Sequence, residues 1–184
     1  MHLPGSVHNI VLVGFMGSGK SSVGREIAGR CELRFLDTDS IIRRKYRKSI
    51  SDIFASFGEP VFRDEENRVL EDLQNARRIV LATGGGIVLQ TRNHDPLRSL
   101  GVVIWLTASE EVIWERVSRN QSRPLLQTAD PRTTIRNLMS ARYPLYRSVA
   151  DITLETSGLT HHEVADRLVA AIGAWSAGRH EDKN

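Results

Sequence analysis

The segment that most constrains the fold of this chain spans residues 14–21 and reads GFMGSGKS. It fits the pattern G-x-x-x-x-G-K-[ST], whose glycines let successive backbone N–H groups point into one concavity around phosphate oxygens. Such a loop needs a buried strand before it and a helix after it, because the helix dipole adds positive potential. Residues 9–13 form an apolar, β-branched run, and apolar side chains then recur at helical spacing at Val23, Ile27 and Ala28. We predict a strand–loop–helix unit that binds a nucleoside triphosphate, rather than a merely flexible glycine-rich turn.

The loop also carries the side chains that a triphosphate and its metal ion need. Lys20 supplies a mobile positive charge for the β- and γ-phosphates, and the Ser21 hydroxyl is a hard oxygen ligand suited to Mg²⁺. The residues expected to contact the nucleotide here are Gly17, Ser18, Gly19, Lys20, Ser21 and Ser22.

The rest of the chain continues this alternation of apolar runs and helical patterns. Further apolar, β-rich runs lie at residues 34–36, 79–82, 102–106 and 151–154. Helical patterns lie at residues 21–31, 40–47, 51–57, 60–74, 110–119, 133–149 and 160–177. Strands that alternate with helices indicate an α/β fold, with a parallel sheet covered by helices on both faces. Ligands of such sheets bind at the carboxyl ends of the strands, so the residues after each run are the candidate site.

Size and composition indicate one globular domain. The chain has 184 residues, of which we assign 9–177 to the domain and 1–8 and 178–184 to flexible tails. The formal net charge of +3, from 25 Lys and Arg against 22 Asp and Glu, does not by itself indicate nucleic-acid binding. No apolar run reaches the ~20 residues of a membrane span, and the N-terminal residues lack the pattern of a secretory signal. The single cysteine, Cys31, cannot form an internal disulfide, and we expect a cytoplasmic protein without membrane contact.

Two acids, Asp37 and Asp39, follow the second apolar run. Residues two apart on an extended segment point the same way, so both carboxylates are candidates for the site. We predict that Asp37 holds Mg²⁺ through water, and that Asp39 orients a substrate hydroxyl and accepts its proton. The alternative is that both acids only cap or solvate a turn, with Asp39 capping a helix that starts at Ser40.

Three glycines, Gly84, Gly85 and Gly86, follow the third apolar run. Glycines at a strand end let the backbone approach a ligand closely, and their N–H groups can donate to a carboxylate or a hydroxyl. The alternative is a tight turn that leads into a helix.

Three arginines are candidates for binding anions, because a planar guanidinium binds a carboxylate through two parallel hydrogen bonds. Arg63 opens a long helical pattern, where a solvated helix charge is the alternative, and Arg142 lies in a later one. Arg123 lies in a polar connector, residues 118–131, which we interpret as a mobile lid that closes over the phosphates. The basic run at residues 43–48 is interpreted as a solvated helix face.

Taken in order, these motifs resemble those of the shikimate kinase family. Many nucleoside triphosphatases share the phosphate loop, so Arg63, the glycine triplet and Arg142 are the selective part of the resemblance. It covers residues 9–172 and rests on the segment 14–21, Asp37 with Asp39, Arg63 with Glu66, Gly84 to Gly86, RPLL at 123–126 and RYPLY at 142–146.

The resemblance implies a three-layer α/β/α fold of P-loop kinase type with a five-stranded parallel sheet, a mobile lid and substrate-binding helices. It implies ATP-dependent phosphorylation of the 3-hydroxyl of shikimate, a step toward chorismate and the aromatic amino acids. We expect a monomer that binds shikimate, ATP and one Mg²⁺ ion, and no nucleic acid.

The resemblance also assigns roles to single residues. Arg63 and Arg142 would clamp the shikimate carboxylate beside Gly84, Gly85 and Gly86, and Asp39 would be the partner of the reacting hydroxyl. Ser21 and Asp37 would form the Mg²⁺ site, and Lys20 and Arg123 would neutralise charge during transfer. Arg119, with Arg116 close by, would stack on adenine. Some members place a proline on the other face of adenine, and the corresponding loop here, residues 156–161, has none.

Two rival functions remain open from the sequence. A gluconate kinase of the same fold would also bind a carboxylate and hydroxyl groups, so two arginines alone do not exclude it. A non-catalytic ATP-binding module would be expected to lose Asp39 or Arg123, and both are present.

Overall fold

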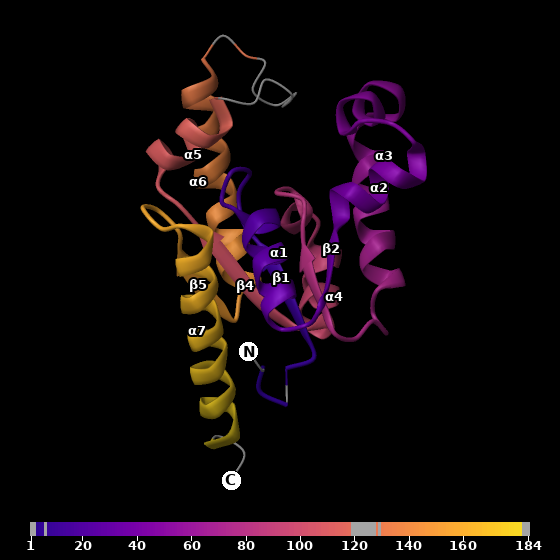
Figure 1. Cartoon of the computed structure of the whole chain (residues 1–184). Coiled ribbons are helices and arrows are strands. Elements are labelled where there is room, and N and C mark those ends of the chain that lie inside the picture. Colours follow the sequence, from indigo (N-terminus) through magenta and orange to yellow (C-terminus); the bar gives the residue numbers. More distant parts are fainter. Residues whose placement is uncertain (1–2, 6, 119–127, 129, 182–184) are drawn as a thin grey trace.

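The computed structural model describes residues 3–5, 7–118, 128 and 130–181, and its centre is a five-stranded parallel sheet (Figure 1). The strands are β1 (Asn9–Val13), β2 (Arg34–Asp37), β3 (Ile79–Ala82), β4 (Val102–Thr107) and β5 (Ile152–Glu155). Their order in the sheet is β2-β3-β1-β4-β5, so the phosphate loop leaves the central strand between two neighbours. The five predicted runs are thereby confirmed as strands.

The register of the strands brings their carboxyl ends to one edge of the sheet. Leu12 pairs with Ala82 across β1 and β3, and Asp37 pairs with Ala82 across β2 and β3. The phosphate loop, the acids after β2 and the glycines after β3 therefore begin at the same level. This alignment is what gathers the predicted site residues.

Helices cover both faces of the sheet, because successive side chains of each strand point to opposite faces. Ile10 and Leu12 pack with apolar residues of α1 (Lys20–Arg30) and α7 (His161–Glu181). Val11 and Val13 pack in the other core cluster, which draws residues from α3 (Ile50–Asp72), α4 (His94–Leu100), α5 (Glu110–Ser118) and α6 (Pro131–Val149). The three-layer α/β/α arrangement is confirmed.

Helices α2 (Thr38–Tyr46) and α3 lie at one side of the carboxyl edge, while α5 and α6 lie at the other (Figure 1). Ile42 of α2 packs against Ile53 and Phe62 of α3 in a small core of their own. Helix α3 breaks at Gly58, whose φ of 80° is not helical, and Pro60 follows in the first turn of the second half. The two helical patterns predicted at 51–57 and 60–74 are the two halves of α3.

Some elements differ from the sequence prediction. Helix α4 and two short 3₁₀ turns, η1 (Ile87–Leu89) and η2 (Thr91–Asn93), were not expected, because Pro96 and a polar segment obscured the helical period. Residues 178–181 were assigned to a flexible tail, yet they continue α7, where the Arg179 guanidinium lies 4.8 Å from the centre of the Trp175 ring. Within the described part of the chain, none of the helices is long and apolar enough to cross a membrane.

Candidate functional site

The phosphate loop curls between β1 and α1 and is shaped by three glycines with positive φ, Gly14, Gly17 and Gly19. A side chain at Gly14 would meet the Ser18 hydroxyl at 2.9 Å and the Leu106 carbonyl group, so only glycine fits there. Lys20 is buried, and its Nζ donates to the carbonyl oxygens of Gly14 and Phe15 at 2.8 Å each. These bonds hold the ammonium group over the loop, as a phosphate-binding lysine requires.

A cavity of about 260 Å³ opens beside this loop. Besides loop residues and Ser22, its lining includes Asp37, Asp39, Thr83, Arg116 and His161. The cavity has room for an anion surrounded by backbone donors, one lysine and one arginine. We refer to it below as the donor cavity.

Ser21 and Asp37 lie together at the floor of the donor cavity. The Ser21 hydroxyl donates to Asp37 Oδ2 at 2.9 Å, and Asp37 Oδ1 accepts from the backbone N–H of Ser40 at 2.8 Å. Two protein oxygens suffice for Mg²⁺, which keeps several waters and takes its other ligands from phosphates. Among the described residues, no group of three or more His, Cys, Asp or Glu side chains could hold a metal ion. The pair therefore fits a nucleotide-bound Mg²⁺ and not an all-protein cage.

The prediction for the two acids was wrong in one respect. Asp37 is extended and caps α2, whereas Asp39 lies in the first turn of that helix, so the two carboxylates are not on one extended segment. Helix α2 begins at Thr38, two residues earlier than predicted, because the Asp37 side chain already satisfies the N–H of Ser40. The helical turn carries Asp39 away from Ser21 and Asp37 and toward the glycines after β3.

A second cavity, the acceptor cavity, lies between α2, α3, α6 and the glycine triplet. One wall is apolar, and its members are Met16, Ile50, Phe54 and Phe62. The opposite wall is polar, and its members are Asp39, Arg63, Glu66, Arg142 and the three glycines. Such a cavity suits a small molecule with one apolar face and a ring of charged and hydroxyl groups.

Arg63 begins the second half of α3 and is held in place by two carboxylates. Its Nη1 donates to Glu66 Oε2 at 2.7 Å, and its Nε and Nη2 donate to Glu59 Oε1 at 3.0 and 2.7 Å. These bonds use three of the five guanidinium N–H groups, so two remain for a ligand. Burial alone would lower the pKa of Arg63, but the two carboxylates outweigh it and raise the pKa, so the charge is kept.

Arg142 reaches the same cavity from α6 and is held differently. Its Nη1 donates to the carbonyl oxygen of Gly85 at 3.2 Å, and the Tyr146 hydroxyl donates to the same oxygen. Among the described residues, no carboxylate forms an ion pair with Arg142, although its side chain is buried. Glu66, in the same cavity, feels the charge of Arg142 without bonding it, so the guanidinium keeps donors for an anionic ligand.

Two glycines of the triplet, Gly84 and Gly86, make room for polar side chains, whereas Gly85 makes room for the backbone of the phosphate loop. A Cβ at Gly84 would lie 2.5 Å from Glu66 Oε1 and 2.6 Å from Asp39 Oδ1, and a Cβ at Gly86 would collide with the Arg63 guanidinium. The N–H of Gly84 donates to the Thr38 hydroxyl at 2.8 Å, and the contact of Gly84 with a ligand stays a prediction. Gly84 and Gly86 thus let these side chains approach the backbone, which local sequence reasoning did not foresee.

Glu66 is the least expected member of the site. It is fully buried, and its Oε1 has no hydrogen-bond partner among the described residues. Burial raises the pKa of Glu66 to about 7, against the opposing pull of Arg63, and Asp39 nearby raises it further. The sequence analysis named this residue only through the resemblance, in which Glu66 accompanies Arg63.

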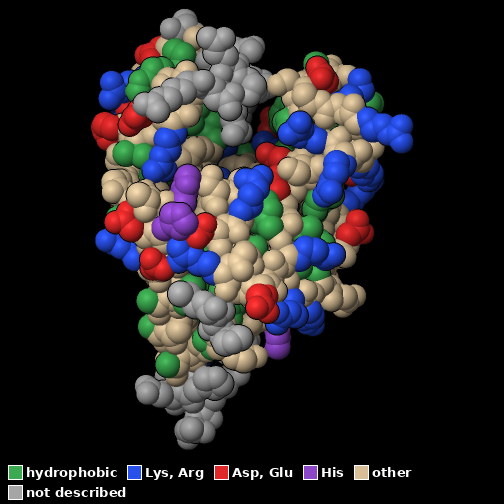
Figure 2. All heavy atoms as spheres, viewed as in Figure 1, with side chains coloured by type: hydrophobic (Ala, Val, Ile, Leu, Met, Phe, Trp, Pro, Cys, Tyr) green, Lys and Arg blue, Asp and Glu red, His purple; other side chains and the backbone are tan. Residues whose placement is uncertain are grey.

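The donor and acceptor cavities meet at Met16, Asp39 and Gly85, which line both. Asp39 thus lies where a phosphate held by the loop would face a hydroxyl held in the acceptor cavity. The surface is hollowed in this region between α2–α3 and α5–α6 (Figure 2). The arrangement supports transfer of a phosphoryl group between two ligands.

Two of the predicted residues, Arg119 and Arg123, lie outside the described residues. Arg116 is the described arginine that lines the donor cavity at the end of α5. Its Nη1 donates to the carbonyl oxygen of Gly17 at 3.1 Å, which fixes the guanidinium plane beside the loop. Arg116 is thus a described candidate for stacking on the base, and the prediction for Arg119 stays a prediction.

Comparisons with known proteins agree with this geometry. The family model described as shikimate kinase matches residues 16–173. A shikimate kinase of Thermodesulfovibrio yellowstonii is 43% identical over 93% of this chain and 98% of its own length. A shikimate kinase of Rhodopseudomonas palustris is 45% identical over 89% of this chain and 80% of its own length.

Solved structures give the same result. The structure of a shikimate kinase from Acinetobacter baumannii in complex with shikimate superposes with a TM-score of 0.87 at 40% identity, over 91% of this chain and 93% of that one. A gluconokinase from Sinorhizobium meliloti covers 100% of both chains with a TM-score of 0.63 at 17% identity, which shows a shared fold alone.

Proposed function

Because the chain belongs to the shikimate kinase family, we propose that its two adjoining cavities bind ATP and shikimate and bring them together at Asp39. The protein is a phosphotransferase with shikimate kinase activity, a step of the shikimate pathway that leads to the aromatic amino acids. The reaction would be an in-line transfer of the γ-phosphoryl group to the 3-hydroxyl. The observation that carries this proposal is that Asp39 lines both cavities.

In the acceptor cavity, Arg63 and Arg142 would clamp the carboxylate of shikimate from two different helices. Arg63 has two N–H groups left after binding Glu59 and Glu66, and the hydrogen bond described for Arg142 goes to the carbonyl oxygen of Gly85. The cyclohexene ring would lie on the apolar wall formed by Ile50, Phe54 and Phe62. An open-chain polyol such as gluconate has no flat apolar face for that wall, which favours shikimate over gluconate.

At the junction of the cavities, Asp39 would orient the 3-hydroxyl and accept its proton as the phosphoryl group arrives. Lys20, held over the loop by two carbonyl oxygens, would follow the charge that develops on the phosphate. Catalysis would thus consist of positioning and charge neutralisation. Arg123, outside the described residues, stays a predicted lid arginine in this proposal.

The donor cavity would hold ATP with Mg²⁺ as its metal ion. Ser21 Oγ and the Asp37 carboxylate, 2.9 Å apart, are the side chains that would hold the ion, Asp37 through water. When bound, Mg²⁺ would neutralise phosphate charge. Ser21 and Asp37 would keep the ion at the phosphate end of the cavity, and Arg116 would pack on the base.

We also propose that the protein acts as a monomer, since residues of a single chain line both cavities. Light scattering on the purified protein, with and without both substrates, measures this directly. A dimer that persists on dilution below micromolar concentration would contradict the monomer.

The function is tested by ADP release from the purified protein with shikimate, with gluconate and with neither. We expect turnover with shikimate and Mg²⁺, near-background release with gluconate, and loss of turnover on chelation of the metal. The Lys20→Ala variant serves as the negative control. Equal rates with gluconate would sink the assignment of the acceptor cavity to shikimate.

A further inference from the structure

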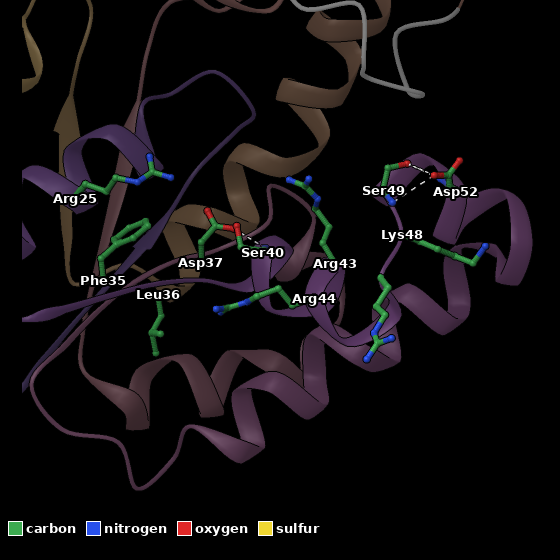
Figure 3. A pocket seen from close by; sticks show the side chains of 11 residues that line it. Arg25, Phe35, Leu36, Asp37, Ser40, Arg43, Arg44, Lys48, Ser49 and Asp52 are labelled. Atoms are coloured by element: carbon green, nitrogen blue, oxygen red, sulfur yellow. Dashed lines mark hydrogen bonds between the residues drawn. The ribbon is translucent and has the colours of Figure 1, made fainter.

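A third hollow, a groove of about 900 Å³, lies outside both cavities and is built from α1, β2, α2 and the start of α3 (Figure 3). Its cationic side chains are Arg25, Arg43, Arg44, Arg47 and Lys48. All five side chains are exposed, and neither the donor cavity nor the acceptor cavity contains any of them. We call this region the basic groove.

The cations of the basic groove lie close together, and no described acidic side chain within ion-pair distance offsets their charge, although Lys48 lies near enough to Asp52 to lower the pKa of that carboxyl group. Among the described residues, none of the five forms an ion pair. Lys45, on the same helix α2, instead bonds Glu65 at 2.5 Å, and Arg68 bonds the other oxygen of Glu65. The charge of the groove is therefore left for solvent or for a ligand.

Two acids also line the groove, but other groups hold them. Asp37 accepts from Ser21 and from the backbone of Ser40, and Asp52 forms a capping box with Ser49 at the start of α3. Five cations and two acids give the lining a net charge of +3, which equals the formal net charge of the whole chain. The excess positive charge of the protein is thus concentrated here, and Figure 2 shows Lys and Arg side chains gathered over α2 and α3.

The groove leads to the phosphate end of the donor cavity. Asp37 lines both, whereas the groove and the acceptor cavity share no residue. Arg25 lies one helical turn after Ser21, donates to its carbonyl oxygen at 3.2 Å, and rests 4.9 Å from the centre of the Phe35 ring. The ends of Arg25 and Arg43 lie on either side of the Asp37 carboxylate, and Arg44 extends on the side of Leu36 (Figure 3).

We propose that the basic groove captures the anionic nucleotide and guides its phosphates toward the donor cavity. The inference rests on the proposed function, because it takes ATP to be the ligand of that cavity. A surface lined by one sign of charge raises the local concentration of an oppositely charged ligand and so its association rate, by 10- to about 1,000-fold at low salt. ATP is favoured over shikimate as the guided ligand because the groove adjoins the donor cavity alone.

The effect on binding rate depends on salt in a way that a direct contact does not. Charges separated by more than a Debye length, about 10 Å at 0.1 M salt, are largely screened from one another. Guidance by the groove therefore acts on the association rate constant and weakens as ionic strength rises. The dissociation rate constant, which reports contacts in the final complex, should change little.

The test is stopped-flow binding of a fluorescent N-methylanthraniloyl ATP to the full chain over a series of salt concentrations. We compare the wild type with Arg43→Glu/Arg44→Glu, and with a control, Arg147→Glu/Arg167→Glu, that changes the net charge equally. Arg147 and Arg167 are exposed on α6 and α7 and line none of the three hollows. A neutral variant, Arg43→Gln/Arg44→Gln, removes the positive charge without placing negative charge at the C-terminal end of α2, where it would oppose the helix dipole.

For the groove variant we expect an association rate constant about tenfold lower at low ionic strength and a flattened salt dependence. The neutral variant should show a smaller loss of the same kind, and the control variant a change of less than about twofold. Equal losses in the groove and control variants would mean that net charge alone acts, and would overturn the proposal. So would a faster dissociation with an unchanged association rate, which indicates a direct contact.

Two further measurements separate the possible failures. If wild-type protein bound no nucleotide and phosphorylated no shikimate, the proposed function itself would fail. If turnover was intact and the groove variant bound nucleotide at the wild-type association rate, only the proposed role of the groove would fail. A short single-stranded oligonucleotide is also tested at about 0.1 M salt. Retention by the wild type and its loss in the groove variant, with nucleotide association unchanged, would assign the groove to nucleic acid instead.

Discussion

Arg142 and Arg63 face the same cavity, but removing them would have different consequences. Arg63 neutralises Glu66 and Glu59, so its loss would leave a buried carboxylate without a partner and disturb α3. Arg142 bonds only a carbonyl oxygen among the contacts described for it, so its loss leaves no acid unpaired. At the scale of single residues, Arg142 is the better probe of how the carboxylate of shikimate is bound.

We expect Arg142→Ala to weaken shikimate binding by about 2–3 kcal/mol, or roughly 30- to 150-fold, because it removes charge-assisted hydrogen bonds in a buried site. Titration calorimetry measures the dissociation constants of shikimate and ATP separately. Arg142→Lys keeps the charge but not the planar guanidinium, so its affinity for shikimate should lie between those of the wild type and Arg142→Ala. Unchanged shikimate affinity, or an equal loss of ATP affinity, would contradict the carboxylate clamp.

Glu66 predicts a pH dependence of stability. Burial raises the pKa of Glu66 from 4.5 to about 7, so the folded protein binds this proton more tightly than the unfolded chain does. The stabilisation that comes from this tighter proton binding is therefore fully present below about pH 4.5. It is lost as the pH rises to about 7, a change of about 3 kcal/mol in the free energy of unfolding.

Urea unfolding at about pH 5 and about pH 8 measures this change. Glu66→Gln, which keeps an acceptor for Arg63, should remove most of the difference between the two pH values. Glu71→Gln, an exposed change on the same helix, is the control and should leave it in place. If Glu66→Gln and the wild type responded to pH alike, Glu66 would not be the titrating group.

At the scale of elements, two glycines of α1 look equivalent in the sequence but are not in the structure. A Cβ at Gly24 would lie 2.6 Å from Phe35 Cε2 and 3.2 Å from a methyl group of Leu12, whereas a Cβ at Gly29 would meet nothing within 4 Å. Gly24 therefore lets α1 pack closely on β1 and β2. Gly29 is exposed, and its only effect is the poor helix propensity of glycine.

We expect Gly29→Ala to stabilise the protein by about 0.5–1 kcal/mol, because alanine favours the helix without steric cost. Gly24→Ala gains the same propensity but overpacks the interface at a cost of about 1–3 kcal/mol, so it should be neutral or destabilising. Thermal and urea unfolding of both variants give the comparison. A stabilising Gly24→Ala would show that Phe35 moves aside freely.

The difference between local signals and contacts between distant segments also explains which elements the sequence could predict. The strands were predicted because a buried parallel strand is a continuous apolar run, which is a local signal. Helix α4 was missed, because Pro96 lies in its first turn and few of its residues are apolar. The two halves of α3 were predicted as separate helical patterns on either side of Gly58, but the packing of Ile42 on Phe62 depends on distant segments.

In the site, the positions at strand ends were predictable and the contacts between segments were not. Asp37 and Gly84 were found from residue type and from place in the predicted sheet, whereas Arg63 and Arg142 were candidates from residue type and received their role from the resemblance. The burial of Glu66, and the need for Gly86 where the Arg63 guanidinium approaches, depend on how α3 packs against the segment after β3. Such contacts leave no local period or motif, so only the folded structure reveals them.

At the scale of the whole molecule, the fold does not choose the substrate. The gluconokinase with a TM-score of 0.63 has the same architecture at 17% identity. In the function that we propose, the choice depends on residues brought together from separate parts of the chain: Asp39 of α2, Arg63 of α3 and Arg142 of α6. Since α2 and α3 lie across the carboxyl edge from α6, a ligand that bonds both arginines ties the two sides of the molecule together (Figure 1).

Ligand binding should therefore stabilise the whole fold, and the ligands of the donor and acceptor cavities should do so independently of each other. A ligand at one hundred times its dissociation constant stabilises the folded state by about 2.7 kcal/mol, which for a chain of this size raises the melting temperature by roughly 5–11 °C. We expect shifts of this order with shikimate and with MgADP, measured by differential scanning calorimetry. Arg142→Ala should lose the shikimate shift and keep the MgADP shift, and Lys20→Ala should do the reverse. If either variant lost both shifts while its melting temperature without ligand was unchanged, the two cavities would not be separate half-sites, and the division of the site at Asp39 would be wrong.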